Sequence, residues 1–254
     1  MFDKLLSLID RGAMVDILTV IECSSKDDRM IGRMIIVDVD GRVEGPFDDD
    51  IILQIQDIMR EIVWVKPLTF SVQDQFGETY RLFWDRTTKR PHALVFGGGH
   101  ISQPLVHMLS MLDFHVTVVD DRPEFSNPER FPLAEAVICE SFSKVFQQLT
   151  IDKDTAIIIV TRGHRYDLDC LHATIDSDAR YLGMIGSKKR VREMINLLRE
   201  EGTSEENLRR LRAPIGLDIN AETPVEIALS IAAEVVSNFR GGSNLPLSGM
   251  KEGV

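Results

Sequence analysis

Residues 92–121 limit the folds available to this chain more than any other stretch. They begin with the apolar run His-Ala-Leu-Val-Phe, turn through Gly97, Gly98 and Gly99, and continue as an amphipathic segment to residue 112. A second apolar run over residues 115–121 ends in two acids, Asp120 and Asp121. This order predicts a strand, a glycine turn, a helix and a second strand. It is the βαβ unit that holds a nucleotide phosphate on the backbone amides of a helix N-terminus.

The residue types of this unit suit that role. Gly97 permits a sharp turn out of the strand, and Gly99 lets the backbone approach a pyrophosphate without a Cβ in the way. Ser102 stands where a third glycine is usual; it is small enough for close helix–strand packing and can cap the helix or donate to a phosphate. Asp120 ends the second strand, where an acid accepts hydrogen bonds from a ribose diol. The pattern therefore favours a ligand with an unphosphorylated ribose.

Beyond residue 91 the chain alternates between strand and helix patterns, as α/β proteins do. The β-branched run over residues 155–161 is typical of a central parallel strand that is buried on both faces. We expect a Rossmann-like, doubly wound parallel sheet over residues 91–240 and a flexible Gly/Ser-rich tail over residues 241–254. The further strands are expected at 135–139 and 180–185, and the helices at 142–149, 167–175, 187–201 and 224–239, the last opening with a capping box.

The first 88 residues have a different pattern and predict a small α+β domain. Residues 13–22 and 34–38 have the pattern of strands, with a hairpin turn at Asp40-Gly41, and residues 49–61 have apolar residues at helical spacing. A second hairpin is expected from Pro67 through Phe76-Gly77 to Trp84. The polar residues 85–91, which end in proline, predict the linker.

Ligands of open α/β sheets bind beyond the carboxyl ends of the strands, and four loops are expected there. The glycine loop adds His100 to the candidate residues. The loop after the second strand carries Arg122, which can neutralise a phosphate, lock the two preceding acids in place or form an ordinary surface ion pair.

The other two loops follow later strands. Thr161, Arg162 and His164 come after the central strand, where the last two can reach an anion and the histidine can shuttle protons. In the alternative, His164 caps the helix and Arg162 pairs with Asp167. The fourth loop supplies Gly186, Ser187 and Lys188. Basic residues in a first helical turn oppose the helix dipole, so this cluster indicates either an external anion or a solvated basic face.

Composition excludes several classes of partner. The net charge of -11 and the pI of about 5.0 argue against nucleic acid and anionic membranes as partners. The apolar runs fall short of the roughly 20 residues of a membrane span, and the start does not resemble a signal peptide, so a cytoplasmic protein is expected. Three separated cysteines and six histidines without ligand spacing predict neither a disulfide framework nor a metal site, and Cys139 is expected to be buried.

The loops together resemble the xanthine dehydrogenase accessory factor family, which includes maturation factors of carbon monoxide dehydrogenase. Five strings recur in order, and they are far more specific than any one motif. They are Phe-Gly-Gly-Gly-His (96–100), Val-Thr-Val-Val-Asp-Asp-Arg-Pro-Glu-Phe (116–125), Val-Thr-Arg-Gly-His (160–164), Gly-Met-Ile-Gly-Ser (183–187) and Ala-Pro-Ile-Gly-Leu-Asp-Ile (213–219). The resemblance is weaker in the N-terminal domain. There the family's glycine-rich loop is replaced by Gly-Pro-Phe-Asp-Asp-Asp (45–50), whose acids repel phosphate.

The resemblance implies a chaperone that binds the molybdenum cofactor, a pterin in monophosphate or dinucleotide form. It also implies that the chaperone assists sulfuration with a cysteine desulfurase and delivers the cofactor to an apo molybdenum hydroxylase such as xanthine dehydrogenase. Two alternatives use the same fold: an NAD-dependent oxidoreductase, for which only His164 offers acid–base chemistry, and a nucleotide-sensing regulatory protein. The resemblance favours a cofactor carrier over a turnover enzyme. A homodimer is expected because closed twofold assemblies are the commonest.

Overall fold

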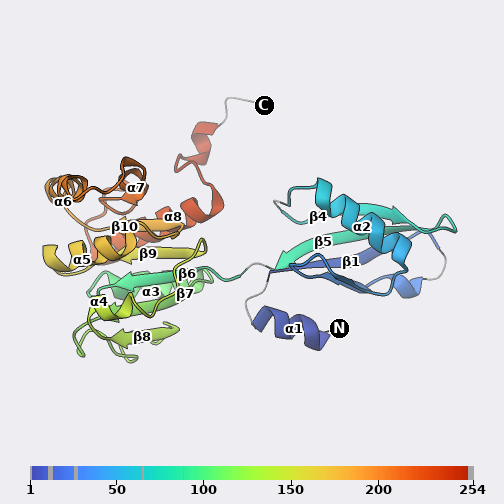
Figure 1. The fold of residues 1–254 in the computed structure, drawn as a ribbon, viewed down its shortest axis with the longest axis horizontal. Coiled ribbons are helices and arrows are strands. Elements are labelled where there is room, and N and C mark those ends of the chain that lie inside the picture. The colour runs from blue at the N-terminus through green and yellow to red at the C-terminus, as the bar shows by residue number, and fades with distance from the viewer. Residues whose placement is uncertain (1, 11–13, 26–27, 65, 88, 251–254) are drawn as a thin grey trace. The chain divides into compact units, whose positions relative to one another are not determined.

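The computed structural model describes residues 2–10, 14–25, 28–64, 66–87 and 89–250. The chain divides into two compact units, Met1–Lys89 and Arg90–Val254 (Figure 1). Each unit is described by itself.

The N-terminal unit is a five-stranded antiparallel sheet in the order β3-β2-β1-β5-β4. Helix α2 (Asp49–Glu61) packs Ile51 and Ile55 into a core with Leu18, Leu82 and Trp84 of the sheet. The predicted α+β class, both hairpins and the helix are confirmed. The strands are β1 (Val15–Cys23), β2 (Met34–Val37), β3 (Val43–Glu44), β4 (Leu68–Gln73) and β5 (Thr79–Thr87).

Three features of this unit differ from the sequence analysis. Helix α1 (Phe2–Asp10) was not predicted; it packs Leu5 against Val15 and Ile36 in a small separate cluster, and a 3-10 turn, η1 (Asp28–Met30), was also not predicted. The predicted linker begins too early, because residues 85–87 belong to β5 and pair with β1. The strand tolerates charge at this point because Arg86 forms an ion pair with Asp16 of β1.

The C-terminal unit contains six parallel strands in the order β11-β10-β9-β6-β7-β8. The chain winds outward from β6 through β7 to β8 and then returns to the other side of β6 with β9. This arrangement confirms the Rossmann-like doubly wound sheet and makes the gap between β6 and β9 its topological switch point. The strands are β6 (His92–Phe96), β7 (His115–Asp120), β8 (Ala136–Cys139), β9 (Thr155–Ile159), β10 (Tyr181–Met184) and β11 (Leu211–Arg212).

Helices cover both faces of this sheet (Figure 1). α3 (Ser102–Met111) and α8 (Pro224–Arg240) share one core cluster, whereas α4 (Phe142–Val145), α5 (His164–Thr174), α6 (Lys188–Glu200) and α7 (Glu205–Arg210) contribute to the other. β9 supplies Ala156 and Ile158 to the first cluster and Ile157 and Ile159 to the second. The central strand is therefore buried on both faces, as predicted.

The expected elements of this unit recur with shifted ends. α4 stops at Val145 and continues only as hydrogen-bonded turns, while α5 begins at His164, three residues before the predicted start. α7 and β11 were not predicted. The capping box of α8 is formed by Thr223 and Glu226 as expected. Cys139 is exposed, contrary to expectation, because it ends β8 at the edge of the sheet.

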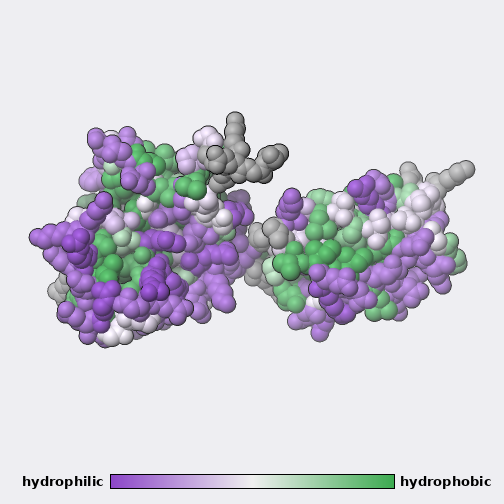
Figure 2. Space-filling model, turned by 90° about the horizontal axis from the view of Figure 1, so that it is seen from above, coloured by the Kyte–Doolittle hydropathy of each residue, from purple (hydrophilic) through white to green (hydrophobic). Residues whose placement is uncertain are grey.

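The surfaces of the units are mixed. In Figure 2 a hydrophobic band crosses the visible surface of the N-terminal unit, and the visible surface of the C-terminal unit is mostly hydrophilic. The described tail ends in a 3-10 turn, η2 (Leu247–Met250). Within the described ranges, no helix combines the length and apolar character needed to cross a membrane.

Candidate functional site

The residues predicted to bind a ligand lie at one edge of the C-terminal sheet, beyond the carboxyl ends of four adjacent strands. The glycine loop follows β6, the acid pair follows β7, and the remaining loops follow β9 and β10. In open α/β sheets this edge is where ligands bind, particularly at the switch point. The residues are Gly97, Gly98, Gly99, His100 and Ser102 after β6; Asp120, Asp121 and Arg122 at β7; Thr161, Arg162 and His164 after β9; and Gly186, Ser187 and Lys188 after β10.

The three glycines of the loop have different surroundings. Gly97 has φ +108°, and a Cβ there would lie 2.5 Å from the carbonyl oxygen of Val160. A Cβ on Gly98 would lie 2.2 Å from the carbonyl oxygen of Phe125. A Cβ on Gly99 would meet no atom of the described residues within 4 Å. Packing therefore explains the first two glycines, whereas Gly99 borders open space.

Side chains hold the Gly98 residue from both sides. Its N–H donates to Asp120 Oδ2 at 2.8 Å, and its carbonyl accepts from Arg130 Nε at 3.1 Å. Asp120 also accepts from Arg122 Nε at 2.8 Å and Nη2 at 2.9 Å, and from the Arg122 N–H at 3.1 Å. Burial alone would raise the pKa of the Asp120 carboxyl, but these hydrogen bonds outweigh it and hold the pKa below its ordinary value.

This geometry fixes what Asp120 does within the chain. Its side chain is 3% exposed, and both carboxylate oxygens accept from Arg122. Arg122 thus holds Asp120 in place, which is one of the roles considered for it. Because the Arg122 side chain is only 20% exposed, this ion pair is not an ordinary surface pair. The hydroxyl of Ser102 donates to the Gly97 carbonyl. A role for Asp120 or Ser102 toward a ligand stays a prediction.

The sequence analysis missed two residues that shape this loop. The Phe125 ring is close to two guanidinium groups, with Arg122 Cζ 3.7 Å and Arg130 Cζ 5.1 Å from its ring centroid. Nη2 of Arg130 is buried and has no hydrogen-bond partner within the described residues. The available signal was the aromatic residue that follows Asp-Arg-Pro-Glu, since aromatic faces attract guanidinium groups.

Asp121 and Arg162 meet above the sheet edge. Arg162 Nη2 lies 3.4 Å from each carboxylate oxygen of Asp121 and donates to the Tyr166 hydroxyl at 3.0 Å. The hydrogen bond with Tyr166 raises the pKa of Arg162, while burial and the nearby Arg122 act in the opposite direction. Two arginines and one partly exposed acid therefore converge beside the glycine loop.

The loops after β9 and β10 are joined by a buried acid. Asp167 is fully buried, accepts from the Thr161 hydroxyl and pairs with Arg190 of α6. The alternative in which Arg162 pairs with Asp167 is therefore wrong, because Arg190 takes that position. The N-cap of α5 is Gly163, which has no side chain, and the His164 side chain lies outside the described residues.

The residues after β10 are less tightly organised. Ser187 is the N-cap of α6 and accepts from the Arg190 N–H at 3.3 Å. A Cβ on Gly186 would make only ordinary contacts, the nearest at 3.4 Å to Val191. Lys188 is exposed at the start of α6. Its role in binding an anion stays a prediction.

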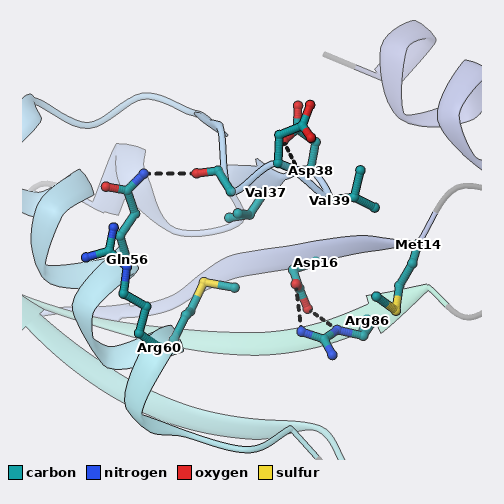
Figure 3. A pocket seen from close by; sticks show the side chains of 11 residues that line it. Met14, Asp16, Val37, Asp38, Val39, Gln56, Arg60 and Arg86 are labelled. Carbon is teal, nitrogen blue, oxygen red and sulfur yellow. Dashed lines mark hydrogen bonds and ion pairs between the residues drawn. The ribbon is translucent and has the colours of Figure 1, made fainter.

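The N-terminal unit has a cavity of about 400 Å³ between β1, α2, the end of β5 and the β2–β3 turn (Figure 3). Arg86 holds Asp16 with bonds of 2.6 and 2.9 Å, and Trp84 Nε1 donates to the same carboxylate at 2.7 Å. Asp38 and Asp40 on the turn add two negative charges, and Arg60 on α2 adds a positive one. These mixed charges favour no single ligand class, so the glycine loop is the stronger candidate site.

The acids that the resemblance places where the family has a glycine-rich loop lie at the start of α2. Asp48 is its N-cap, and Asp49 and Asp50 occupy its first turn. Negative charge at this position stabilises the helix dipole and repels phosphate.

Comparison with known proteins identifies the second unit. A family model described as the XdhC Rossmann domain matches residues 93–235. YqeB of Escherichia coli K-12 is 33% identical over 176 residues, which are 68% of this chain and 32% of YqeB. A probable xanthine dehydrogenase subunit from Bacillus subtilis 168 is 26% identical over 161 residues, 63% of this chain and 47% of that protein.

Two further proteins are similar. The molybdenum cofactor insertion chaperone PaoD of Escherichia coli K-12 is 36% identical over 87 residues, 34% of this chain and 27% of PaoD. The match thus spans less than half of each of these three relatives. A crystal structure described as a xanthine dehydrogenase from Bacillus halodurans superposes with a TM-score of 0.57 at 19% identity, covering 94% of this chain and 95% of that one. At this identity the likeness supports the fold.

Proposed function

Because this chain belongs to the XdhC Rossmann-domain family, we propose that it is a maturation factor that carries the molybdenum cofactor to an apo molybdenum hydroxylase such as xanthine dehydrogenase. Two relatives support the proposal by name, one as a molybdenum cofactor insertion chaperone and one as a probable component of xanthine dehydrogenase. The observation that carries it is the open space at Gly99, where the backbone is bare and no atom of the described residues lies within 4 Å of a Cβ.

The residues around this space fit the phosphate of a pterin cofactor. α3 begins directly after the loop, its N-cap makes no side-chain hydrogen bond and its first turn has no acid. The first amides of a helix lack partners within the helix, so they and the helix dipole favour an anion. Arg122 and Arg162 lie at the same edge, each paired with an aspartate, and Arg162 in its longer, partly exposed pair is the cation that a phosphate can engage. In this proposal the chain binds and orients the cofactor through its phosphate, and the chemistry of the molybdenum belongs to the client enzyme.

The proposal is tested in a strain that lacks this protein. The client hydroxylase should be made but should be inactive and lack cofactor, and the wild-type chain should restore it. Gly99→Val should fail to restore it while remaining folded, because a branched side chain fills the space that the phosphate needs. Full client activity in the deletion strain would refute the maturation role.

The same protein distinguishes a carrier from an oxidoreductase. Purified protein should carry a copurifying pterin, identified by mass spectrometry together with molybdenum analysis. It should not oxidise or reduce a nicotinamide cofactor with a panel of small hydroxyl or carbonyl substrates. Substrate-dependent turnover of the nicotinamide would show that the class is wrong.

A further inference from the structure

The Asp121–Arg162 ion pair connects the loops after β7 and β9 across the end of the strand between them, β6. Val119 of β7 and Ile159 of β9 are both register partners of Phe96 in β6, so β6 lies between the two strands. Neighbouring strands are about 4.8 Å apart, which places the ends of β7 and β9 about 10 Å from each other. The contact between Asp121 and Arg162 therefore crosses the end of β6, where the chain enters the glycine loop.

This ion pair differs from its buried neighbour. The Arg162 and Asp121 side chains are 43% and 28% exposed, and both N–O distances are 3.4 Å. Asp120, by contrast, is 3% exposed and bound by Arg122 at 2.8 and 2.9 Å. A long, partly exposed pair contributes little stability, whereas a buried bidentate pair is hard to replace. A ligand can therefore displace the Asp121–Arg162 ion pair more readily than the Asp120–Arg122 ion pair.

We propose that Asp121 and Arg162 form a latch that a nucleotide opens by replacing both halves, its phosphate taking Arg162 and its ribose diol taking Asp121. This inference rests on the proposed phosphate site at the glycine loop. The acid that accepts hydrogen bonds from the ribose hydroxyls in such folds lies at the end of the second strand. Here the first acid is occupied by Arg122 and Gly98, so the second acid takes that role.

The latch distinguishes ligands by whether the Asp121 carboxylate keeps a hydrogen-bonding partner when the ligand binds. A ligand with phosphate but no sugar must pull Arg162 from Asp121 and leaves that carboxylate without a partner. A nucleotide supplies partners for both groups, so opening the latch costs it less. Asp121 thus opposes the binding of simple phosphates and supports the binding of ligands that carry a ribose diol.

The test compares inorganic pyrophosphate with ADP, which adds a ribose diol and a base to the same diphosphate. In Asp121→Asn, pyrophosphate should bind about 2- to 5-fold more tightly, in line with the small energies of partly exposed ion pairs. ADP should bind about 5-fold or more weakly, because a charged acceptor for the diol is lost. Arg162→Gln should weaken both probes about 10-fold. Titration calorimetry measures the affinities of the wild type and of both variants for each probe, with circular dichroism to confirm the fold.

Glu205→Gln is the matched control. It removes the same charge from another exposed ion pair of this unit, Arg199–Glu205, for which side-chain exposures are 48% and 55%. That pair joins α7 to the last turn of α6, whose first turn lies at the ligand edge, so about 18 Å of helix separates it from the site. Salt screens charges over such a distance. Neither probe should change affinity in this variant.

Each outcome decides the inference. Opposite shifts for the two probes in Asp121→Asn support the latch. Shifts in the same direction, or no shift, overturn it while the phosphate site stands, because the wild-type protein binds. Failure of the wild-type protein to bind either probe overturns the latch together with the phosphate site on which it rests.

Discussion

Gly98 and Gly99 are adjacent, yet the structure predicts opposite consequences for substituting them. A Cβ on Gly98 would lie 2.2 Å from the carbonyl oxygen of Phe125 and 3.0 Å from its carbon. A Cβ on Gly99 would meet nothing within 4 Å in the part of the chain that the structure describes. Gly98→Ala should therefore destabilise the C-terminal unit, and Gly99→Val should leave it folded. The difference separates a glycine required by packing from one that a ligand requires.

The expected magnitudes follow from what must move. The obstacle at Gly98 is backbone, and the turn that holds it is tied by hydrogen bonds from Phe125 N and Ser126 N to the Arg122 carbonyl, 3.0 and 2.9 Å long. Overpacking typically costs about 1–3 kcal/mol, and a fixed backbone places Gly98→Ala in the upper part of that range. For a unit of this size the midpoint of thermal unfolding should fall by roughly 4–12 °C. Gly99→Val should stay within about 0.5 kcal/mol of the wild type.

Thermal unfolding followed by circular dichroism measures both stabilities, and titration with pyrophosphate measures binding. We expect Gly99→Val to unfold like the wild type and to bind no pyrophosphate. A Gly98→Ala protein as stable as the wild type would refute the packing argument. A folded Gly99→Val protein with unchanged affinity would refute the assignment of the loop as the phosphate site.

Three further predictions concern stability. The pKa of Asp120 is lowered on folding, so its ionised form stabilises the protein above about pH 4, and this contribution is lost as the pH falls through the folded pKa. The difference in unfolding free energy between the wild type and Asp120→Asn, measured by urea unfolding, should therefore be largest near pH 7 and should shrink below about pH 4. Asp16→Asn should cost about 2–3 kcal/mol in the same assay, because Arg86 loses its counter-charge and Trp84 Nε1 keeps at best a weaker acceptor. Thr223→Ala should cost about 1 kcal/mol through the broken capping box, visible as a thermal midpoint roughly 2–4 °C lower, and an unchanged midpoint would contradict it.

The elements that neighbouring residues determine by themselves were predictable from the sequence. The run over residues 155–161 has too many β-branched residues for a helix and too few polar ones for a surface strand, and it forms the buried β9. Thr223 and Glu226 satisfy each other's backbone amides, which fixes the start of α8 without help from the rest of the fold.

The missed elements depend on distant partners or are very short. β11 consists of two residues and exists only because Leu211 and Arg212 pair with Leu182 and Gly183 of β10. The end of β5 resembles a linker in sequence because its residues are charged. The charge of Arg86 is compensated by Asp16, which lies 70 residues away in the sequence.

The positions of the candidate site were predictable, but its partnerships were not. Strand order and glycine spacing place the loops at one edge of the sheet. No spacing rule, however, brings Arg130 to the Gly98 carbonyl, since 32 residues separate them and the contact depends on how the intervening turns fold. A fold constrains backbone positions more strongly than it constrains which long side chains meet.

The choice between Asp120 and Asp121 shows this limit most clearly. Alternation along the strand does not separate them, because β7 is covered on both faces and nearly all of its residues are buried. Arg122 distinguishes them, because its side chain pairs with Asp120, two residues earlier, whereas Asp121 pairs with Arg162. Asp120→Asn should therefore lower stability and shift the affinities for pyrophosphate and ADP in the same direction, since an amide holds the Gly98 N–H and Arg122 less firmly than a carboxylate does. Asp121→Asn should change only the preference between the two probes. If the two variants behave alike, the acids share one role and the distinction drawn from their burial is wrong.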